Sequence, residues 1–327
     1  MGACWLVTGA AGFIGSHIVQ NLLKGGNKVV GLDNFSTGKR ENLEDVRRSV
    51  GAAWSSFTLI EGDVSVGADA ARACKGVEFV SHQGALGSVP RSIEEPLATH
   101  RANVNGFLEM YLAARDAGVK RFVYASSSSV YGDSPELPKR EERLGEVLSP
   151  YAASKLIDEI YAGVCARLYK LPTVGLRYFN VFGPRQDPNG AYAAVIPRWI
   201  STLMAGKQCE IYGDGKTSRD FCYVDNVVQA NVLSATTSNA AALNQAYNVA
   251  VGEQMDLTEL HALIVSIMKE LGRANVVAAP VYKPFREGDV KHSKADISKA
   301  INLLGYKPTI KAREGMRAVV EWYLKNS

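Results

Sequence analysis

Residues 8–15 read Thr8-Gly9-Ala10-Ala11-Gly12-Phe13-Ile14-Gly15, and they lie between an apolar run and a helical pattern. Glycines at these spacings let the backbone turn sharply, approach a pyrophosphate closely and pack the helix against a sheet. The start of that helix offers unpaired N–H groups and a partial positive charge to phosphate oxygens. Glycines also serve ordinary turns, so the motif depends on its surroundings.

The surroundings support a dinucleotide site. Asp33 ends the next apolar run, at about the distance where a carboxylate binds the adenosine ribose hydroxyls and repels a 2′-phosphate. This favours NAD over NADP, although the nearby Lys39-Arg40 weakens the preference. Asp63 follows the third apolar run and is expected to contact adenine, with an ordinary turn aspartate as the alternative.

Apolar runs alternate with helical patterns through the first half of the chain, with helices expected at Gly12–Lys24 and Leu97–Ala117. This alternation predicts an α/β protein with a doubly wound parallel Rossmann sheet. The candidate strands are Ala3–Thr8, Lys28–Asp33, Phe57–Glu61, Val77–His82, Arg121–Ser126 and Thr173–Tyr178.

Beyond Asn180, loops dominate before capped helices return. Asp256 with Glu259 predicts a capping box, Gly272 the end of that helix, and Asp296 the start of another that Gly305 ends. We expect a second, smaller α/β substrate domain. The predicted division is an NAD-binding domain over residues 1–178, to which 222–250 return, and a substrate-binding domain formed by 179–221 and 251–327.

Composition excludes several classes of protein. A net charge of +4 over 327 residues predicts no nucleic-acid partner. No run approaches the roughly 18 to 20 apolar residues of a membrane span, and the N-terminus lacks the basic leader of a signal peptide. The cysteines are scattered without Cys-x-x-Cys pairs, which predicts free thiols, no metal site and a cytoplasmic location. They are Cys4, Cys74, Cys165, Cys209 and Cys222.

A second motif, Ser149-Pro150-Tyr151-Ala152-Ala153-Ser154-Lys155, carries side chains for acid–base chemistry. Ser149 can cap a helix that begins with Pro150, so that Tyr151 and Lys155 share one helix face. A phenol has a pKa of about 10 in water, too high for a base at neutral pH. A neighbouring ammonium and the positive ring of an oxidised nicotinamide both favour the phenolate. The motif therefore predicts a general base, although Tyr-x-x-x-Lys also occurs on ordinary helices.

Upstream, Tyr124-Ala125-Ser126-Ser127-Ser128-Ser129-Val130-Tyr131-Gly132 places a serine run at the carboxyl end of a predicted strand, where parallel sheets hold ligands. A solvated turn is the alternative. The glycine loop, this serine run and the Tyr151/Lys155 pair resemble the extended short-chain dehydrogenase/reductase family over essentially the whole chain. The resemblance implies that Ser127 joins Tyr151 and Lys155 in a catalytic triad.

The resemblance also implies bound NAD. The expected cofactor site is formed by Gly9, Gly12, Phe13, Ile14, Gly15, Asp33, Asn34, Ser36, Gly38, Asp63, Val64, Gln83, Tyr151 and Lys155.

The same resemblance distinguishes between reactions. Family dehydratases carry an Asp-Glu pair directly after the triad Thr, and related decarboxylases carry a Glu there, whereas this chain has Ser128 and Ser129. The acid for an elimination is therefore missing, and NAD-dependent C4 epimerisation of a UDP-hexose is expected. Dehydration, decarboxylation or simple dehydrogenation on the same scaffold, and a non-catalytic NAD-sensing module, are the alternatives.

Further segments of the chain imply a UDP-sugar substrate. Leu176–Pro184 is similar to the epimerase segment whose asparagine contacts the diphosphate, here Asn180. Arg219 and Arg286 match the family's diphosphate-binding arginines, and Asp289 matches its uridine ribose contact.

Sugar preference is suggested by the stretches Ala85–Ser92 and Arg185–Tyr192, which resemble UDP-N-acetylglucosamine 4-epimerases. Ser293 falls at the family's gatekeeper position, where a tyrosine restricts the pocket to glucose-sized sugars and a small residue admits a 2-acetamido group. The corresponding uronic acids and UDP-glucose remain alternatives. The resemblance also places Gly87, Ser88, Ser128, Ser129 and Gln186 in the sugar pocket.

A homodimer is implied as well, formed through helices at Leu97–Ala117 and Tyr151–Leu168. The second helix has an apolar surface broader than one sheet contact needs, although all of it could belong to the domain core. Its members are Leu156, Ile157, Ile160, Val164 and Leu168.

Overall fold

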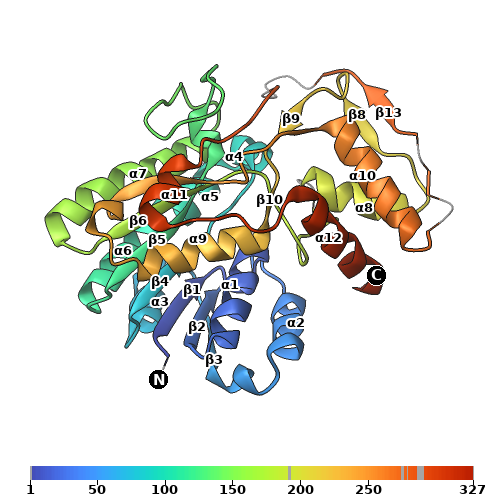
Figure 1. The fold of residues 1–327 in the computed structure, drawn as a ribbon. Coiled ribbons are helices and arrows are strands. Elements are labelled where there is room, and N and C mark those ends of the chain that lie inside the picture. Colours follow the sequence, from blue (N-terminus) through green and yellow to red (C-terminus); the bar gives the residue numbers. More distant parts are fainter. Residues whose placement is uncertain (1, 191–192, 274–275, 278, 286–290, 327) are drawn as a thin grey trace.

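The computed structural model describes residues 2–190, 193–273, 276–277, 279–285 and 291–326. A seven-stranded parallel sheet lies at its centre, in the spatial order β3-β2-β1-β4-β5-β6-β11 (Figure 1). This confirms the predicted Rossmann-type α/β fold. The strands are β1 (Cys4–Thr8), β2 (Lys28–Asp33), β3 (Phe57–Glu61), β4 (Phe79–His82), β5 (Arg121–Ser127), β6 (Thr173–Tyr178) and β11 (Gln245–Val249).

Both faces of the sheet are covered by helices, which is why its strands read as nearly continuous apolar runs. In β1 successive side chains enter opposite cores: Trp5 and Val7 lie in one buried cluster and Leu6 in another. The first cluster includes residues of α1 (Phe13–Lys24), α9 (Val224–Thr236) and α11 (Ser298–Leu304). The second includes residues of α3 (Gly67–Cys74), α6 (Gly106–Asp116) and α7 (Pro150–Tyr169).

The helix expected over Leu97–Ala117 is interrupted in the structure. It consists of α5 (Pro96–His100), the π-helical turn η2 (Arg101–Asn105) and α6. The π turn carries Asn103, whose side chain binds the backbone of Leu86 and the hydroxyl of Ser154. Single π turns inside α-helices are frequent at functional sites, and apolar periodicity does not reveal them.

A further buried cluster lies beside the sheet. It joins α8 (Val195–Met204), α10 (Leu257–Glu270) and α12 (Ala312–Asn326), and it is built from large side chains such as Trp199, Ile264 and Met316. Three pairs of short strands accompany it. They are β7 (Val181–Phe182) with β10 (Cys222–Tyr223), β9 (Ser218–Arg219) with β12 (Met255–Asp256), and β8 (Glu210–Tyr212) with β13 (Val281–Lys283).

Helix ends follow the predicted capping chemistry with one correction. Asp256 and Glu259 form the expected capping box at the start of α10. However, α11 begins at Ser298 with Ile297 as its N-cap, so Asp296 lies one residue further upstream than predicted. Its carboxylate still accepts the Ser298 N–H, at 2.9 Å. The remaining elements are α2 (Arg40–Val50), α4 (Val89–Glu94), η1 (Gly51–Ser56), η3 (Ser128–Tyr131) and η4 (Ala240–Ala242).

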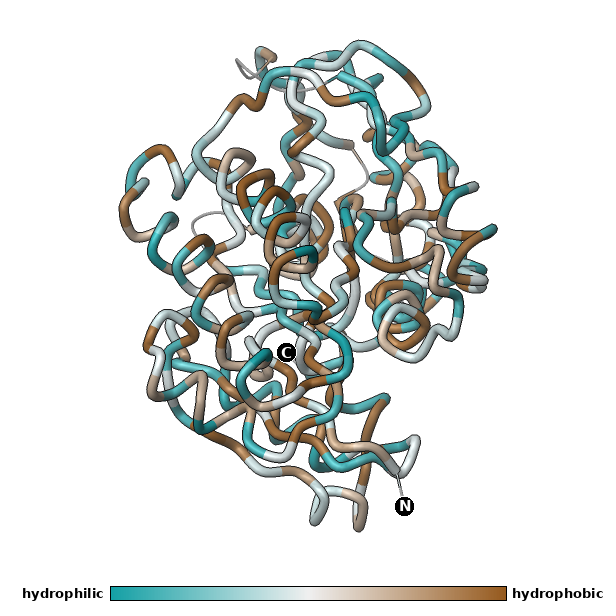
Figure 2. The backbone as a smooth tube through the Cα atoms, turned by 90° about the vertical axis from the view of Figure 1, so that its left-hand side faces the viewer, coloured by the Kyte–Doolittle hydropathy of each residue, from teal (hydrophilic) through white to brown (hydrophobic). Residues whose placement is uncertain are grey.

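Within the described ranges, no helix combines the length and apolar character that a membrane crossing requires. Figure 2 shows hydrophobic and hydrophilic residues interspersed along the backbone.

A buried ion pair connects the sheet to α7. The Arg177 guanidinium on β6 donates two hydrogen bonds to the Glu159 carboxylate, at 2.8 and 2.7 Å, and both side chains are almost fully buried. The same carboxylate accepts a hydrogen bond from the Ser126 hydroxyl at 2.5 Å. Three elements therefore meet at one charged group.

Replacing one partner should destabilise the protein strongly. Arg177→Met would leave the Glu159 carboxylate buried without its counter-charge, so we expect the free energy of unfolding to fall by about 3 to 5 kcal/mol. Urea unfolding followed by circular dichroism measures this change. Arg317→Met, which removes an exposed ion pair with Glu270, is the control and should barely move the midpoint. Equal midpoints for the two variants would contradict the interpretation.

Candidate active site

The glycine motif forms a tight turn between β1 and α1. Gly9 adopts a positive φ of 62° and donates its N–H to Leu32 on β2 at 2.8 Å. A Cβ at Gly15 would lie 2.0 Å from the Gly9 carbonyl oxygen, so only glycine permits this packing of helix on loop. Gly12 precedes α1 and provides no side-chain cap. The N–H groups at the start of α1 therefore remain available to an anion.

Asp33 at the end of β2 is held beside this turn. Its carboxylate accepts hydrogen bonds from the N–H groups of Ala11 and Phe35, both at 2.8 Å. Burial raises the pKa of Asp33, and the two backbone bonds counteract that rise. A Cβ at Gly38 would lie 2.7 Å from the Asp33 carboxylate. The glycine at position 38 therefore leaves the space that this carboxylate needs. The cradle suits a ribose with free hydroxyls.

One groove runs along the carboxyl ends of the strands, from Asp63 after β3 to Tyr151 and Lys155 on α7. Every residue predicted for the cofactor site lines it. An extended groove that combines a glycine turn, a carboxylate suited to ribose hydroxyls, and the side chains of Tyr151 and Lys155 fits NAD. Sequence analysis missed several other lining residues, among them Thr37, Ala102, Ala125 and Tyr178.

Tyr178 belongs to a hydrogen-bonded network beneath the groove. Its hydroxyl donates to the Gln83 side-chain carbonyl at 3.0 Å and accepts from the Asn231 amide at 2.8 Å. The Gln83 amide in turn donates to Ser81 and Asn231, both at 3.0 Å. Gln83 is thus fixed by three partners from β4, β6 and α9. The position of Asn231, far along the chain, gave no signal in the sequence.

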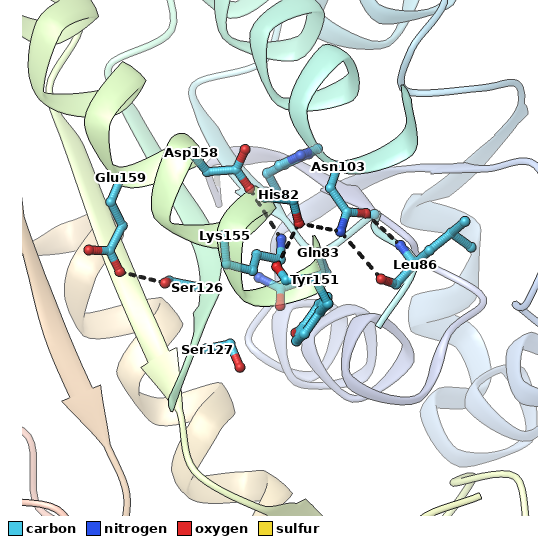
Figure 3. A network of polar contacts seen from close by, with 12 residues as sticks. His82, Gln83, Leu86, Asn103, Ser126, Ser127, Tyr151, Lys155, Asp158 and Glu159 are labelled. Carbon is cyan, nitrogen blue, oxygen red and sulfur yellow. Dashed lines mark hydrogen bonds and ion pairs between the residues drawn. The ribbon is translucent and has the colours of Figure 1, made fainter. Parts of the chain in front are cut away.

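Helix α7 starts as the sequence predicts. The Ser149 hydroxyl accepts the N–H of Ala152 at 3.1 Å, and Pro150 occupies the first helical position. Tyr151 and Lys155 follow on the face that lines the groove. The Lys155 side chain is only 4% exposed, and its ammonium lies 3.4 Å from the Asp158 carboxylate one turn later (Figure 3).

The serine run closes the end of β5. Ser127 is the last residue of the strand, and its hydroxyl oxygen accepts from the N–H and the hydroxyl of Ser129, at 3.1 and 2.8 Å. The hydroxyl hydrogen of Ser127 is thereby left to donate elsewhere. Because α7 packs against β5, Ser127 and Tyr151 come to one region from separate segments (Figure 3). Ser128 and Ser129 continue into η3.

Asn180 and Arg219, both predicted to contact substrate, line a second hollow together. Aromatic side chains share this hollow, including Trp199, Tyr212 and Phe221. Arg198 also lines it, a cation that sequence analysis did not identify. The hollow therefore combines guanidinium groups with flat apolar surfaces.

The other residues predicted to contact substrate lie in different places. Gly87 lines the main groove, whereas the Ser88 hydroxyl caps α4 by accepting the Arg91 N–H. The Gln186 amide donates to the Val181 carbonyl at 3.4 Å, and its side-chain oxygen is buried. The Ser293 N–H donates to the Ser218 carbonyl at 3.0 Å, beside β9. Arg286 and Asp289 lie outside the described residues.

Asp220 organises the region around Asn180 and Ser293, although the sequence gave it no role. Its fully buried carboxylate accepts the N–H groups of Val251, Gly252 and Ala295, at 3.0 to 3.3 Å. Its backbone carbonyl accepts the Asn180 amide. Through its backbone and its side chain, this one residue joins Asn180 to the segment after β11 and to Ala295.

No group of three or more His, Cys, Asp or Glu side chains suited to a metal ion occurs in the described part of the chain.

Comparisons with known proteins identify the family. Residues 5–250 match the model of the NAD-dependent epimerase/dehydratase family. The UDP-glucose 4-epimerase of Mycolicibacterium smegmatis is 37% identical over 98% of this chain and 99% of its own length.

Two solved structures are similar throughout. The UDP-N-acetylglucosamine 4-epimerase of Methanobrevibacter ruminantium, in complex with UDP-N-acetylmuramic acid, is 39% identical with a TM-score of 0.91, and all of both chains is covered. The UDP-glucuronic acid 4-epimerase of Bacillus cereus, with UDP-glucuronic acid and NAD, is 30% identical with a TM-score of 0.86, covering 99% of this chain and 100% of that one. The expected resemblance to extended short-chain dehydrogenases/reductases is confirmed, and the chain belongs to the NAD-dependent epimerase/dehydratase family.

Proposed function

We propose that the protein interconverts the C4 epimers of a UDP-hexose, with UDP-N-acetylglucosamine and UDP-N-acetylgalactosamine as the preferred pair. The observation that carries this proposal is the position of Tyr151 and Lys155, which line the same groove as the glycine turn and Asp33. The relatives named above act on UDP-sugars at C4, and this supports the choice of reaction.

The acid–base work falls to three side chains. Tyr151 accepts the proton of the sugar 4-hydroxyl as the general base, and the Lys155 ammonium lines the groove from the same helix. Ser127 donates its free hydroxyl hydrogen to the same sugar oxygen. NAD held by the glycine turn and Asp33 would supply the redox chemistry, since its nicotinamide can accept a hydride and give it back, and no external reductant would be consumed. Tyr151 finally returns its proton to the oxygen of the 4-keto sugar.

Inversion requires that the keto sugar present its other face while the nucleotide stays bound. We assign the nucleotide to the hollow of Asn180 and Arg219, because guanidinium groups suit phosphate oxygens and the nearby aromatic rings suit a base. Arg286 and Asp289 are proposed to complete this site. Residues 179–221 and 251–327 would then serve as the substrate domain, and 1–178 with 222–250 as the NAD-binding domain.

The sugar pocket is proposed to contain small or neutral side chains, which allow two orientations of one ring. Ser128 and Ser129 stand where a dehydratase needs acids, so elimination lacks its proton donor. The small Ser293 leaves room for an acetamido group. Gly87, Ser88 and Gln186 complete this proposed pocket.

Tyr151→Phe tests the function directly. Without the phenolic oxygen, we expect the epimerisation rate to fall by roughly 10²- to 10⁴-fold, because the general base is lost. The assay incubates enzyme with UDP-N-acetylglucosamine, without added NADH, and separates the C4 epimers by chromatography. Tyr169→Phe, at the exposed end of the same helix, is the matched control. Full turnover by Tyr151→Phe would refute the mechanism, and substrate-dependent release of NADH would favour a dehydrogenase.

Ser293→Tyr tests the choice of sugar. A phenol at this position should fill the space for the acetamido group. The variant should therefore lose more activity on N-acetylated substrates than on UDP-glucose. The measurement compares kcat/KM for both substrates in the variant and in the wild type. Ser266→Tyr, exposed on α10, should change neither value. Loss of UDP-glucose activity alone would count against the gatekeeper assignment.

We also propose a homodimer and a cytoplasmic location. An apolar stripe is exposed on α7, where Ile160, Val164 and Leu168 are 59%, 38% and 65% exposed. On the neighbouring α5, Leu97 is 84% exposed. A second copy would cover this surface. The cytoplasmic location is supported by the free cysteines.

Charges placed on the stripe should separate the subunits. The double variant Ile160→Glu/Leu168→Glu would bury two carboxylates in the interface, so we expect a monomer by analytical ultracentrifugation where the wild type is a dimer. Leu144→Glu, at an exposed site in the loop before α7, should leave the dimer intact. A dimer that persists in the double variant would place the interface elsewhere.

A further inference from the structure

A carboxylic acid lies directly behind the acid–base pair. Asp158 follows Lys155 by one turn of α7, and its carboxylate is 3.4 Å from the Lys155 ammonium. The two side chains are 1% and 4% exposed. The other oxygen of Asp158 is buried and has no hydrogen-bond partner among the described residues. Burial of an incompletely paired carboxyl group is costly, and such costs are concentrated at functional sites.

Other ionisable groups around this pair cannot replace Asp158. Glu159, the next residue of α7, is bound by two hydrogen bonds from Arg177 on β6. Burial and the Lys155 charge lower the pKa of His82 on β4 to about 3, so its ring is neutral. Burial raises the pKa of Tyr124 on β5 well above its usual value, so its phenol is neutral too.

Asp158 is therefore the group whose ionisation changes the charge next to Lys155. We propose that Asp158 is a positioning residue for acid–base catalysis, which sets the charge around Lys155 and, through it, the readiness of Tyr151 to exchange a proton. This inference rests on the proposed function, because it assigns Asp158 a part in the same reaction.

The charge of Asp158 changes close to neutral pH. Burial raises the pKa of Asp158 to about 7, against the opposing effect of Lys155. At pH 6 the carboxyl is mostly neutral and the ammonium is uncompensated, whereas at pH 8 the two form an ion pair. The effect of Asp158 on the reaction should therefore appear on the alkaline side of neutrality.

Asp158→Asn removes the charge and keeps the shape. Without a negative charge beside the Lys155 ammonium, the positive charge of the Tyr151/Lys155 pair is less stabilised, so the variant should lose a proton from this pair at lower pH. We expect the basic limb of the pH profile of kcat to move to lower pH by about one unit, and the acidic limb to move much less. A merely structural defect would lower kcat at every pH without moving either limb. Asp116→Asn, which removes an exposed carboxylate on α6, is the control and should leave both limbs in place.

Melting temperatures give a readout that is independent of activity. The raised pKa means that the stability contributed by the Asp158 carboxyl is fully present below about pH 4 and is lost as the pH rises through about 7. The melting temperature of Asp158→Asn relative to the wild type should therefore increase between pH 5 and pH 8. Asp158→Ser, neutral and smaller, replaces Asp158→Asn in both measurements if the latter does not fold.

The outcomes separate this inference from the proposed function. A wild-type enzyme that epimerises no UDP-sugar would refute the function. An active enzyme whose basic limb is the same in wild type and folded variant would overturn the role of Asp158 and leave the function intact.

Discussion

The buried ion pair between Arg177 and Glu159 is the interaction on which the geometry of the active site depends. A carboxylate in this position is stable only when its hydrogen bonds to β6 and to Ser126 on β5 are all made. Helix α7 can therefore dock at only one height and one rotation against the sheet. Tyr151 and Lys155 lie on the same helix, so their placement relative to the end of β5 is set by this pair.

A second constraint acts from the opposite side of α7. Asn103 in the π turn donates to the Ser154 hydroxyl at 2.9 Å and accepts the Leu86 N–H at 2.8 Å. One amide thus joins the wall of the groove to the residue immediately before Lys155. A regular helix over the same segment would rotate Asn103 relative to its partners, which gives the π turn a physical purpose. The two constraints together hold α7 across its width.

The features of the fold and the candidate site that the sequence predicts are those encoded by residues close together in the chain. The glycine turn, Asp33, the Ser149 cap and the spacing of Tyr151 and Lys155 are each encoded within a few residues. The structure places the glycine turn, Asp33, Tyr151 and Lys155 along one groove, and Ser149 caps the helix that carries the last two. The sequence did not reveal Tyr178, Asn231 or Asp220, whose partners come from strands and helices that only the sheet order brings together. Apolar periodicity indicates which face of a helix or strand is buried, but it does not indicate which polar side chains form hydrogen bonds in the interior. The π turn was missed for the same reason.

Asp158 and Glu159 show how one helix can use adjacent acids differently. Consecutive helical residues point about 100° apart, so Glu159 reaches the sheet while Asp158 faces back along α7 to Lys155. The first carboxylate has a guanidinium and a hydroxyl as partners and contributes to a stable scaffold. The second has one ammonium and an unsatisfied oxygen, an arrangement that sacrifices stability. Its single partner is the ammonium of the proposed acid–base pair. The loss of stability therefore occurs at a position where a change of charge can affect proton transfer.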